Sequence, residues 1–354
     1  MEIKVNRTQN PSPKPDESKL GFGKIFTDHM FICEYSKTAG WHNARIVPFG
    51  NVSLSPACAV FHYGQEMFEG LKAYRTTDGR ILLFRPDKNV ERMNNTNRRL
   101  CIPEIDPDFA LKAIIETVKN DADWVPSAEG TSLYIRPFII ATDPFLGVHP
   151  SGSYLFMIIL SPSGSYYAAG LNPVKIAVED EYVRAVRGGT GFAKVGGNYA
   201  ASLIGQQKAE ERGYAQVLWL DGIHHKYIDE VGAMNVFFVI NGEIITPALE
   251  GSILPGVTRL SAIELLRNKG YKVTERRISI DEVYDAYKQG TLEEMFGTGT
   301  AAVVSPVGEL SWDDKVMIIN DSKIGPVSAM LYKELTDIQW GRSDDGFGWT
   351  TEVK

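Results

Sequence analysis

The chain has 354 residues, of which 44% are hydrophobic and 23% are charged, and its formal net charge is −7 at pH 7. This is the composition of an ordinary globular protein, and the acidic balance argues against a broad nucleic-acid-binding surface. The length favours two domains over one. Cys33, Cys58 and Cys101 are odd in number and widely spaced, which predicts neither a disulfide framework nor a zinc site.

The first 20 residues are polar and contain Pro11, Pro13 and Pro15, so we expect a poorly ordered lead-in. They lack the apolar region of a signal peptide, and no apolar run in the chain approaches the length of a membrane span. Together with the cysteine usage, these features predict a cytoplasmic protein that does not contact a membrane.

Strand and helix patterns alternate in the N-terminal half of the chain. Strands are predicted at 31–35, 44–49, 71–75, 81–85, 132–141 and 154–161, and helices at 57–71, 87–100 and 108–120. Small residues and a proline between 163 and 173 then mark a domain boundary. We therefore predict a small N-terminal α/β domain over residues 21–165, a linker over 166–176 and a larger C-terminal domain over 177–354.

The C-terminal half has the same mixed character. Strands are predicted at 174–179, 215–220, 227–231, 235–240, 243–245 and 293–296, and helices at 199–212, 255–269, 279–289 and 327–339, with a glycine loop at 297–302. The pattern favours an α/β (α+β) protein in which each domain is built around a sheet.

Lys194 lies among five glycines in the segment from Gly188 to Ala200. Such a density of glycine marks backbone that turns sharply or approaches something closely. A flexible surface loop is one interpretation. A phosphate-binding P-loop is excluded, because that pattern requires Gly-Lys-Ser/Thr and Lys194 lies between Ala193 and Val195. A lysine that forms a Schiff base with a carbonyl cofactor is the third interpretation.

A carbonyl cofactor with a phosphate and a pyridine ring would also need a carboxylate at the ring nitrogen and a phosphate site. Asp229 and Glu230 end a predicted strand, and the residues alone do not choose between them. The segment 255–258 opens a helix whose amides could bind phosphate, although Thr258 could equally cap a surface helix. The turn at 299–301 is a second candidate anion site.

Four motifs in a fixed order carry a family resemblance. They are Gly-Gly-Asn-Tyr after the lysine, Tyr-Ile-Asp-Glu-Val-Gly-Ala-Met-Asn, Leu-Pro-Gly-Val-Thr-Arg and Met-Phe-Gly-Thr-Gly-Thr-Ala-Ala. The chain resembles the branched-chain amino-acid aminotransferases of PLP fold type IV from about residue 22 to 306, and the segments 62–70 and 83–86 resemble the same family. The resemblance implies a two-domain fold like that of D-amino-acid aminotransferase, pyridoxal 5'-phosphate (PLP) at the domain interface, no metal, and a homodimer.

The resemblance also implies a role for individual residues. Lys194 forms the Schiff base and moves the proton, Glu230 contacts the pyridine nitrogen, Tyr199 bonds the ring oxygen and Leu254 packs beneath the ring. The phosphate ligands are implied to be Arg92, Val257 through its backbone N–H, Thr258 and Thr300, and Gly256 is also a cofactor-binding candidate.

The substrate pocket is implied by the same resemblance. Its walls are Phe68, Tyr134, Tyr166 and Gly299, and Tyr63 and Val148 are contributed by the partner subunit. The amides of Thr300 and Ala301 receive the α-carboxylate of the substrate. Arg136 receives the side-chain carboxylate when the substrate is glutamate. Core packing is the ordinary alternative for each aromatic residue. Ala233 replaces a threonine found in some members. Ala302 and Ser305 stand where mammalian members have a Cys-x-x-Cys pair, so we predict no redox switch there.

The function implied is transamination between L-leucine, L-isoleucine or L-valine and 2-oxoglutarate by a ping-pong path. Small amino and 2-oxo acids are then the substrates, and no nucleic acid is a partner. Two alternatives remain at this point: another fold type IV enzyme, such as a D-amino-acid or amine transaminase or an aminodeoxychorismate lyase, and a non-catalytic ligand-binding relative.

Overall fold

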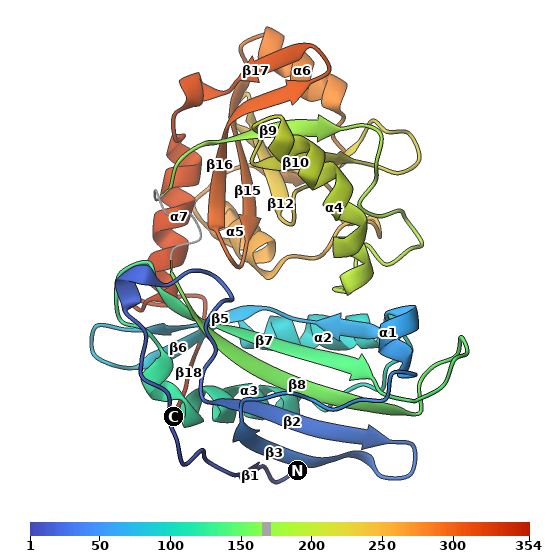
Figure 1. The fold of residues 1–354 in the computed structure, drawn as a ribbon. Coiled ribbons are helices and arrows are strands. Elements are labelled where there is room, and N and C mark those ends of the chain that lie inside the picture. The colour runs from blue at the N-terminus through green and yellow to red at the C-terminus, as the bar shows by residue number, and fades with distance from the viewer. Residues whose placement is uncertain (165–170) are drawn as a thin grey trace. The chain divides into compact units, whose positions relative to one another are not determined.

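The computed structural model describes residues 1–164 and 171–354, and the chain forms two compact units. Unit 1 comprises Met1–Ala168, Lys194–Gly196 and Asp337–Lys354, and unit 2 comprises Ala169–Ala193 and Gly197–Thr336. Each unit contains a large sheet with helices packed on it (Figure 1).

The sheet of unit 1 has the strand order β1-β3-β2-β8-β7-β5-β6-β18, with β4 paired to β7. Its strands are β1 (Lys4–Val5), β2 (His29–Ser36), β3 (Gly40–Pro48), β4 (Glu66–Phe68), β5 (Leu71–Arg75), β6 (Ile81–Phe84), β7 (Ser132–Ala141), β8 (Ser153–Ser163) and β18 (Thr350–Glu352). All of these pairs are antiparallel except that of β1 with β3.

Side chains of β7 alternate between the two faces of this sheet. Leu133, Ile135 and Ile139 are buried in a core shared with helices α2 (Pro86–Arg99) and α3 (Pro107–Asn120). Successive side chains of a strand point to opposite faces, so Tyr134 and Arg136 lie on the face that α2 and α3 do not cover. One strand therefore serves the core and presents polar side chains on its other face.

Local sequence explains where these two helices begin. Pro86 and Pro107 occupy the first helical positions, where the missing N–H costs nothing. The Asp106 side chain caps α3 by accepting a hydrogen bond from the Phe109 amide at 2.8 Å. The two predicted helices are confirmed to within one residue at each end.

The helix predicted over 57–71 is wrong in most of its length. Helix α1 covers only Ala59–Tyr63 and ends at Gly64, whose φ of 58° lies in the left-handed region. Residues Glu66–Phe68 then form β4, which pairs with β7. The apolar spacing of this segment suits a helix, but pairing with a buried central strand decides its conformation.

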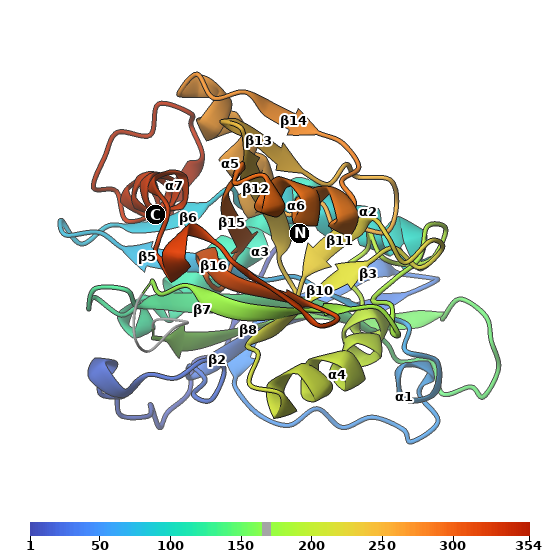
Figure 2. The ribbon, with the colours of Figure 1, turned by 90° about the horizontal axis from the view of Figure 1, so that it is seen from above.

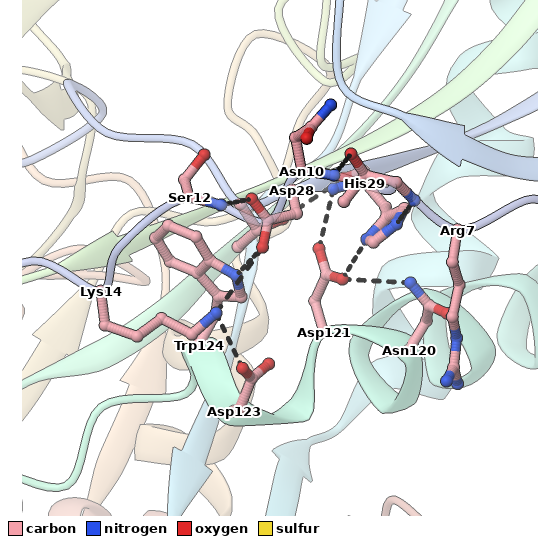
Figure 3. A network of polar contacts seen from close by, with 12 residues as sticks. Arg7, Asn10, Ser12, Lys14, Asp28, His29, Asn120, Asp121, Asp123 and Trp124 are labelled. Atoms are coloured by element: carbon pink, nitrogen blue, oxygen red, sulfur yellow. Dashed lines mark hydrogen bonds and ion pairs between the residues drawn. The ribbon is translucent and has the colours of Figure 1, made fainter.

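Specific polar contacts order the N-terminal segment that the sequence suggests is loose. β1 pairs with β3, and the Thr8 amide donates to His29 Nε2 at 2.9 Å. The His29 ring bonds Asp121 through Nδ1 at 2.6 Å (Figure 3). Composition does not reveal such contacts, because they depend on partners far away along the chain.

The sheet of unit 2 has the order β11-β10-β9-β16-β15-β12-β13-β14, with β17 paired to β16. Its strands are β9 (Val174–Glu179), β10 (Gln216–Leu220), β11 (Ile228–Val231), β12 (Asn235–Ile240), β13 (Glu243–Thr246), β14 (Val273–Glu275), β15 (Leu292–Gly299), β16 (Val303–Trp312) and β17 (Lys315–Ile318). The helices of this half are α4 (Gly196–Glu211), α5 (Val257–Asn268), α6 (Ile280–Lys288) and α7 (Pro326–Gln339), seen from above in Figure 2.

Alternation along β10 places helices on both faces of this sheet. Val217 and Trp219 pack with Ala209 of α4, whereas Leu218 and Leu220 belong to the core that contains α6. The two faces are therefore both buried near β9 and β10, which explains the nearly continuous apolar sequence of these strands.

The domain limits expected from the sequence differ from the two units in two places. Part of the expected linker at 166–176 lies outside the described residues, and β9 already begins at Val174. Residues 337–354, expected in the C-terminal domain, group with unit 1 because β18 pairs with β6, Thr350 opposite Phe84. Within the described ranges, no helix combines the length and apolarity that a membrane span requires.

Asp28 offers a test of the contacts that hold the N-terminal segment (Figure 3). It accepts from the Ser12 amide at 2.8 Å and from the Trp124 indole N–H at 2.9 Å. Replacing Asp28 by alanine leaves a buried indole donor unpaired, which we expect to lower the free energy of unfolding by about 2 kcal/mol in urea titrations.

Asp123→Ala is the matched control, because it removes only an exposed ion pair with Lys14 at 2.7 Å. Such pairs contribute about 0–1 kcal/mol. Equal losses in the two variants would contradict the assignment of Asp28 as the ordering group.

Candidate functional site

In unit 1, Lys194 is held by backbone contacts to two elements. Its amide donates to Thr96 Oγ1 on α2 at 3.0 Å, and its carbonyl accepts from the Phe68 amide on β4 at 3.1 Å. The Gly196 amide donates to a carboxylate oxygen of Glu66. Because the lysine backbone is fixed on both sides, its side chain has a defined direction, and Nζ lies 4.5 Å from the centre of the Phe68 ring.

The electrostatic surroundings prepare the Lys194 amine for chemistry. Burial, and after it the nearby Arg92 cation, lower its pKa to about 8, while Glu69 opposes the shift. About a tenth of the amine is therefore unprotonated at pH 7, far more than for an ordinary lysine, and the unprotonated form is what a nucleophile or a general base requires.

Arg92 and Glu69 form a buried bidentate ion pair. Nε lies 2.8 Å from Oε1 and Nη2 lies 2.9 Å from Oε2, and Asn89 donates to Oε2 at 2.8 Å. Burial raises the pKa of Glu69, but the Arg92 charge and these hydrogen bonds outweigh it, so the pKa is lowered overall. Arg92 is thus a fixed cation on α2, and its charge lowers the pKa of the Lys194 amine.

Arg136 and two aromatic rings lie together on the face of the sheet opposite α2 and α3. Arg136 Nη2 donates to Tyr134 Oη at 2.9 Å, and the guanidinium lies 4.8 Å from the centre of the Phe68 ring. A Cβ on Gly70 would come within 2.1 Å of Tyr134 Oη, so only glycine fits there. The structure therefore brings together Phe68, Tyr134, Arg136 and Lys194.

In unit 2, Tyr199, Glu230 and Leu254 line one hollow with about 310 Å³ of empty volume, together with Ala233 and Arg184. Glu230 Oε1 accepts a hydrogen bond from the Leu254 amide at 2.8 Å and lies 3.4 Å from Arg184 Nη2. The three residues that the family resemblance assigns to the pyridine ring are therefore neighbours.

Asp229 is buried but does not line that hollow. It lines a different one, with about 460 Å³ of empty volume, together with Arg187 and Ser252. Burial raises the pKa of Asp229 to about 6, although Ser252 and Arg184 act to lower it. Alternation along β11 thus separates the two neighbouring carboxylates, and Glu230 is the one that shares a hollow with Tyr199.

Asn235 connects two candidate anion-binding segments of unit 2. Its Nδ2 donates to the Leu254 carbonyl at 2.9 Å, and its backbone pairs with Thr298 on β15. A Cβ on Gly256 would lie 2.0 Å from Asn235 Oδ1, which explains a glycine at this helix start.

The candidate phosphate ligands of unit 2 lie in the two segments that Asn235 connects. Val257 and Thr258 occupy the first turn of α5, where backbone N–H groups lack intrahelical acceptors. Gly299, Thr300 and Ala301 lie where β15 ends and the chain turns into β16. Both segments are anchored through Asn235, so the structure brings the two sets of amides to the same end of the unit.

The remaining substrate candidates lie elsewhere. Tyr63 and Val148 are 43% and 88% exposed and line a third hollow in unit 1, with about 810 Å³ of empty volume, beside Arg99 and Cys101. Tyr166 lies outside the described residues. Among the residues that are described, no group of three or more histidine, cysteine or acidic side chains could hold a metal ion.

Sequence reasoning missed four residues that organise these groups: Glu69, Thr96, Arg184 and Asn235. Glu69 and Asn235 stand inside the motifs that carry the resemblance, so those motifs contained a signal. Thr96 and Arg184 have no local sequence signal, because their partners are 98 and 46 positions away along the chain.

The family model described as amino-transferase class IV matches residues 66–310. The chain belongs to this family. It is 60% identical over 351 residues to branched-chain-amino-acid aminotransferase 2 of Bacillus subtilis (strain 168), covering 99% of this chain and 97% of that protein. It is 54% identical to a probable branched-chain-amino-acid aminotransferase of Staphylococcus aureus (strain N315), covering 99% and 98%.

Solved structures of the family share this fold. The branched-chain amino acid aminotransferase of Escherichia coli has a TM-score of 0.77 at 26% identity, covering 92% of this chain and 99% of that chain. The T.th. branched-chain amino acid aminotransferase with pyridoxamine 5'-phosphate has a TM-score of 0.77 at 28% identity, covering 95% and 99%. The predicted family and the predicted fold class are confirmed.

Asp229 generates a prediction for the pH dependence of stability. Its folded pKa of about 6 exceeds the ordinary 3.8, so its stabilising contribution is complete at low pH and is lost as pH rises through about 6. Relative to the wild type, Asp229→Asn should therefore gain unfolding free energy between these pH values, on the order of 3 kcal/mol.

Urea unfolding at closely spaced pH values measures this difference. Asp180→Asn, which changes an exposed carboxylate just after β9, is the control and should track the wild type at every pH. A constant offset between Asp229→Asn and the wild type would show that the buried carboxyl does not titrate in this range.

Proposed function

We propose that this chain is a PLP-dependent branched-chain-amino-acid aminotransferase, which converts L-leucine, L-isoleucine or L-valine and 2-oxoglutarate to the branched 2-oxo acid and L-glutamate. The observation that carries the proposal is its full-length similarity to aminotransferases of that name in Bacillus subtilis. The arrangement around Lys194 supports the chemistry independently of that similarity.

The donor set of the chain fits PLP. The cofactor presents a phosphate, a protonated ring nitrogen, a ring oxygen and an aldehyde. Glu230 and Tyr199 supply a carboxylate and a hydroxyl for the ring, and Leu254 supplies an apolar contact beneath it. The phosphate is assigned to Arg92 and Thr300, and to the start of α5 at Gly256, Val257 and Thr258, where Gly256 leaves space that a Cβ would fill.

When bound, PLP supplies an electron-accepting ring that stabilises negative charge at the substrate Cα. Lys194 would provide the amine that holds the cofactor, and its Nζ would then take the proton from the substrate Cα and deliver it to C4′, the former aldehyde carbon of the cofactor. A base of pKa about 8 is suited to this transfer near neutral pH. Glu230 stabilises the positive charge at the ring nitrogen, which is what makes the ring an effective electron acceptor.

Substrate choice would depend on the cluster on β4 and β7. Phe68 and Tyr134 offer aromatic surface to a branched aliphatic side chain. Arg136, held against both rings, offers a charge partner when the side chain carries the carboxylate of glutamate. Tyr166 and Gly299 complete the proposed walls, and the amides of Thr300 and Ala301 would receive the α-carboxylate.

Unit 1 and unit 2 would correspond to the small N-terminal domain and the larger PLP-binding domain. We further propose a homodimer in which Tyr63 and Val148 reach the partner's site. Their exposure supports this arrangement, because exposed apolar residues often mark protein contacts. A cytoplasmic location is also proposed, supported by cysteines that are unpaired in the structure.

Coupled turnover assays distinguish this function from its alternatives. L-leucine with 2-oxoglutarate should be the productive pair. Turnover only with D-alanine or aminodeoxychorismate would favour another fold type IV enzyme, and a colourless protein that takes up no PLP would favour a non-catalytic relative.

Lys194→Ala should abolish leucine turnover, with a loss of at least about 10⁴-fold, because no other group replaces the amine. Lys72→Met is the matched control, because burial also lowers the pKa of Lys72 to about 8, and this variant should retain leucine turnover. Borohydride reduction of the wild type followed by peptide mass spectrometry should locate the cofactor on Lys194. A cofactor found on Lys72 instead would refute the assignment.

Mixing two inactive variants tests the proposed dimer. Lys194→Ala lacks the amine, and Tyr63→Ala lacks the residue expected from the partner. After unfolding and refolding together, half of the dimers would be mixed and each would contain one intact site, which restores about a quarter of the wild-type activity. If Tyr63 serves its own subunit, mixing restores nothing, and refolding either variant alone provides the baseline.

A further inference from the structure

Arg184 is a buried cation that connects three separate segments of unit 2. It is 8% exposed, and its Nη2 donates to the carbonyl of Gly191 at 3.3 Å and to the carbonyl of Ser252. The same nitrogen lies 3.4 Å from Glu230 Oε1. Arg184 therefore ties the glycine-rich segment, the loop before α5 and strand β11 to one guanidinium.

A buried carboxylate needs such a partner. Removing a carboxylate from water favours its neutral form, and a like charge nearby adds to that preference. Glu230 is 3% exposed, and the adjacent Asp229 is also buried. Arg184, the Leu254 amide and Tyr199 lie around Glu230. Asp229 is acted on by Ser252, Arg184 and Asp221, and its hollow is also lined by Arg187 and Arg277. Arg184 is the cation that lies 3.4 Å from Glu230 Oε1.

We infer that Arg184 is a positioning residue that keeps Glu230 ionised and aimed into the hollow beside Tyr199 and Leu254. The inference rests on the proposed function, in which Glu230 contacts the pyridine nitrogen of PLP. The Leu254 amide hydrogen-bonds Oε1, and Arg184 Nη2 forms an ion pair with the same oxygen, so both contacts favour the ionised carboxylate and hold that oxygen in place.

The geometry of the neighbouring backbone supports this role. A Cβ on Gly191 would lie 2.2 Å from the Ser252 carbonyl, so glycine permits the two loops to approach closely enough to share Arg184. Arg184 Nε is buried without a hydrogen-bond partner in the described part of the chain. The guanidinium therefore meets Glu230 through Nη2 and not through Nε.

The test compares Arg184→Met, Arg184→Lys and the wild type for PLP affinity, measured by equilibrium dialysis against apo-protein from pH 6 to 9. Arg184→Met should bind PLP about 10- to 100-fold more weakly near pH 7. This is the loss expected when the hydrogen bond between the pyridine nitrogen and a charged Glu230 is lost. The loss should shrink at high pH, where Glu230 ionises without help, and Arg184→Lys should restore much of the affinity.

Infrared difference spectroscopy of apo-protein provides a readout without cofactor. Arg184→Met should show the C=O band of a protonated carboxyl near pH 7 that the wild type lacks. Because Arg184 also lowers the pKa of Asp229, the decisive comparison is made without that carboxyl. The band should persist in Arg184→Met/Asp229→Asn and disappear when Glu230→Gln is added to that variant. A band that is absent from Arg184→Met/Asp229→Asn would place the proton on Asp229 and overturn the inference.

Double variants and controls separate the other outcomes. Arg184→Met/Glu230→Gln should bind PLP no more weakly than Glu230→Gln alone, because the two residues act together. Arg187→Met, on the same loop and exposed, should match the wild type. A uniform, pH-independent loss in Arg184→Met would show that Arg184 only ties the loops. If that variant does not fold, Arg184→Gln, which can still bond a carbonyl, carries the same test.

The outcome also distinguishes this inference from the proposed function. A wild type that takes up no PLP would refute the function itself. A wild type that binds PLP and turns over leucine, with unaltered affinity in Arg184→Met, would overturn only the role of Arg184.

Discussion

Burial of charged groups is the constraint on which the candidate site depends. The same physical effect lowers the pKa of Lys194 to about 8 and raises that of Asp229 to about 6. In the proposed function, burial therefore helps the lysine, which must lose its proton to react, and works against Glu230, which must keep its charge. The chain meets the second requirement with the Arg184 guanidinium and the Leu254 amide, both within reach of one carboxylate oxygen.

A similar balance operates at Arg92. Its bidentate pair with Glu69 fixes a cation in a buried part of unit 1, where an unpaired charge would be costly. Asn89 completes the hydrogen bonding of the carboxylate. Because Arg92 is constrained in this way, its positive charge has a constant effect on the Lys194 amine, and in the proposed function it would need no reorganisation to receive the cofactor phosphate.

The sheets carry these groups through the alternation of their side chains. On β7, one face fills the core while Tyr134 and Arg136 occupy the other. On β11, Asp229 and Glu230 are adjacent in sequence but line different hollows. A strand can thus combine stability and chemistry without interference, since its two faces are independent. Glycine at positions 70 and 256 leaves space beside the backbone, which the side chains of Tyr134 and Asn235 occupy.

The sequence by itself determined the family, most helices and strands, and the identity of Lys194 and Glu230 as candidates, because these depend on local periodicity and on contiguous motifs. Only the tertiary structure decided that residues 66–68 form a strand, that the polar N-terminal segment is ordered and that residues 337–354 join unit 1. It also supplied Thr96, Glu69 and Arg184 as the partners of the reactive groups. These features depend on contacts between residues distant in sequence, whose energies no local pattern encodes.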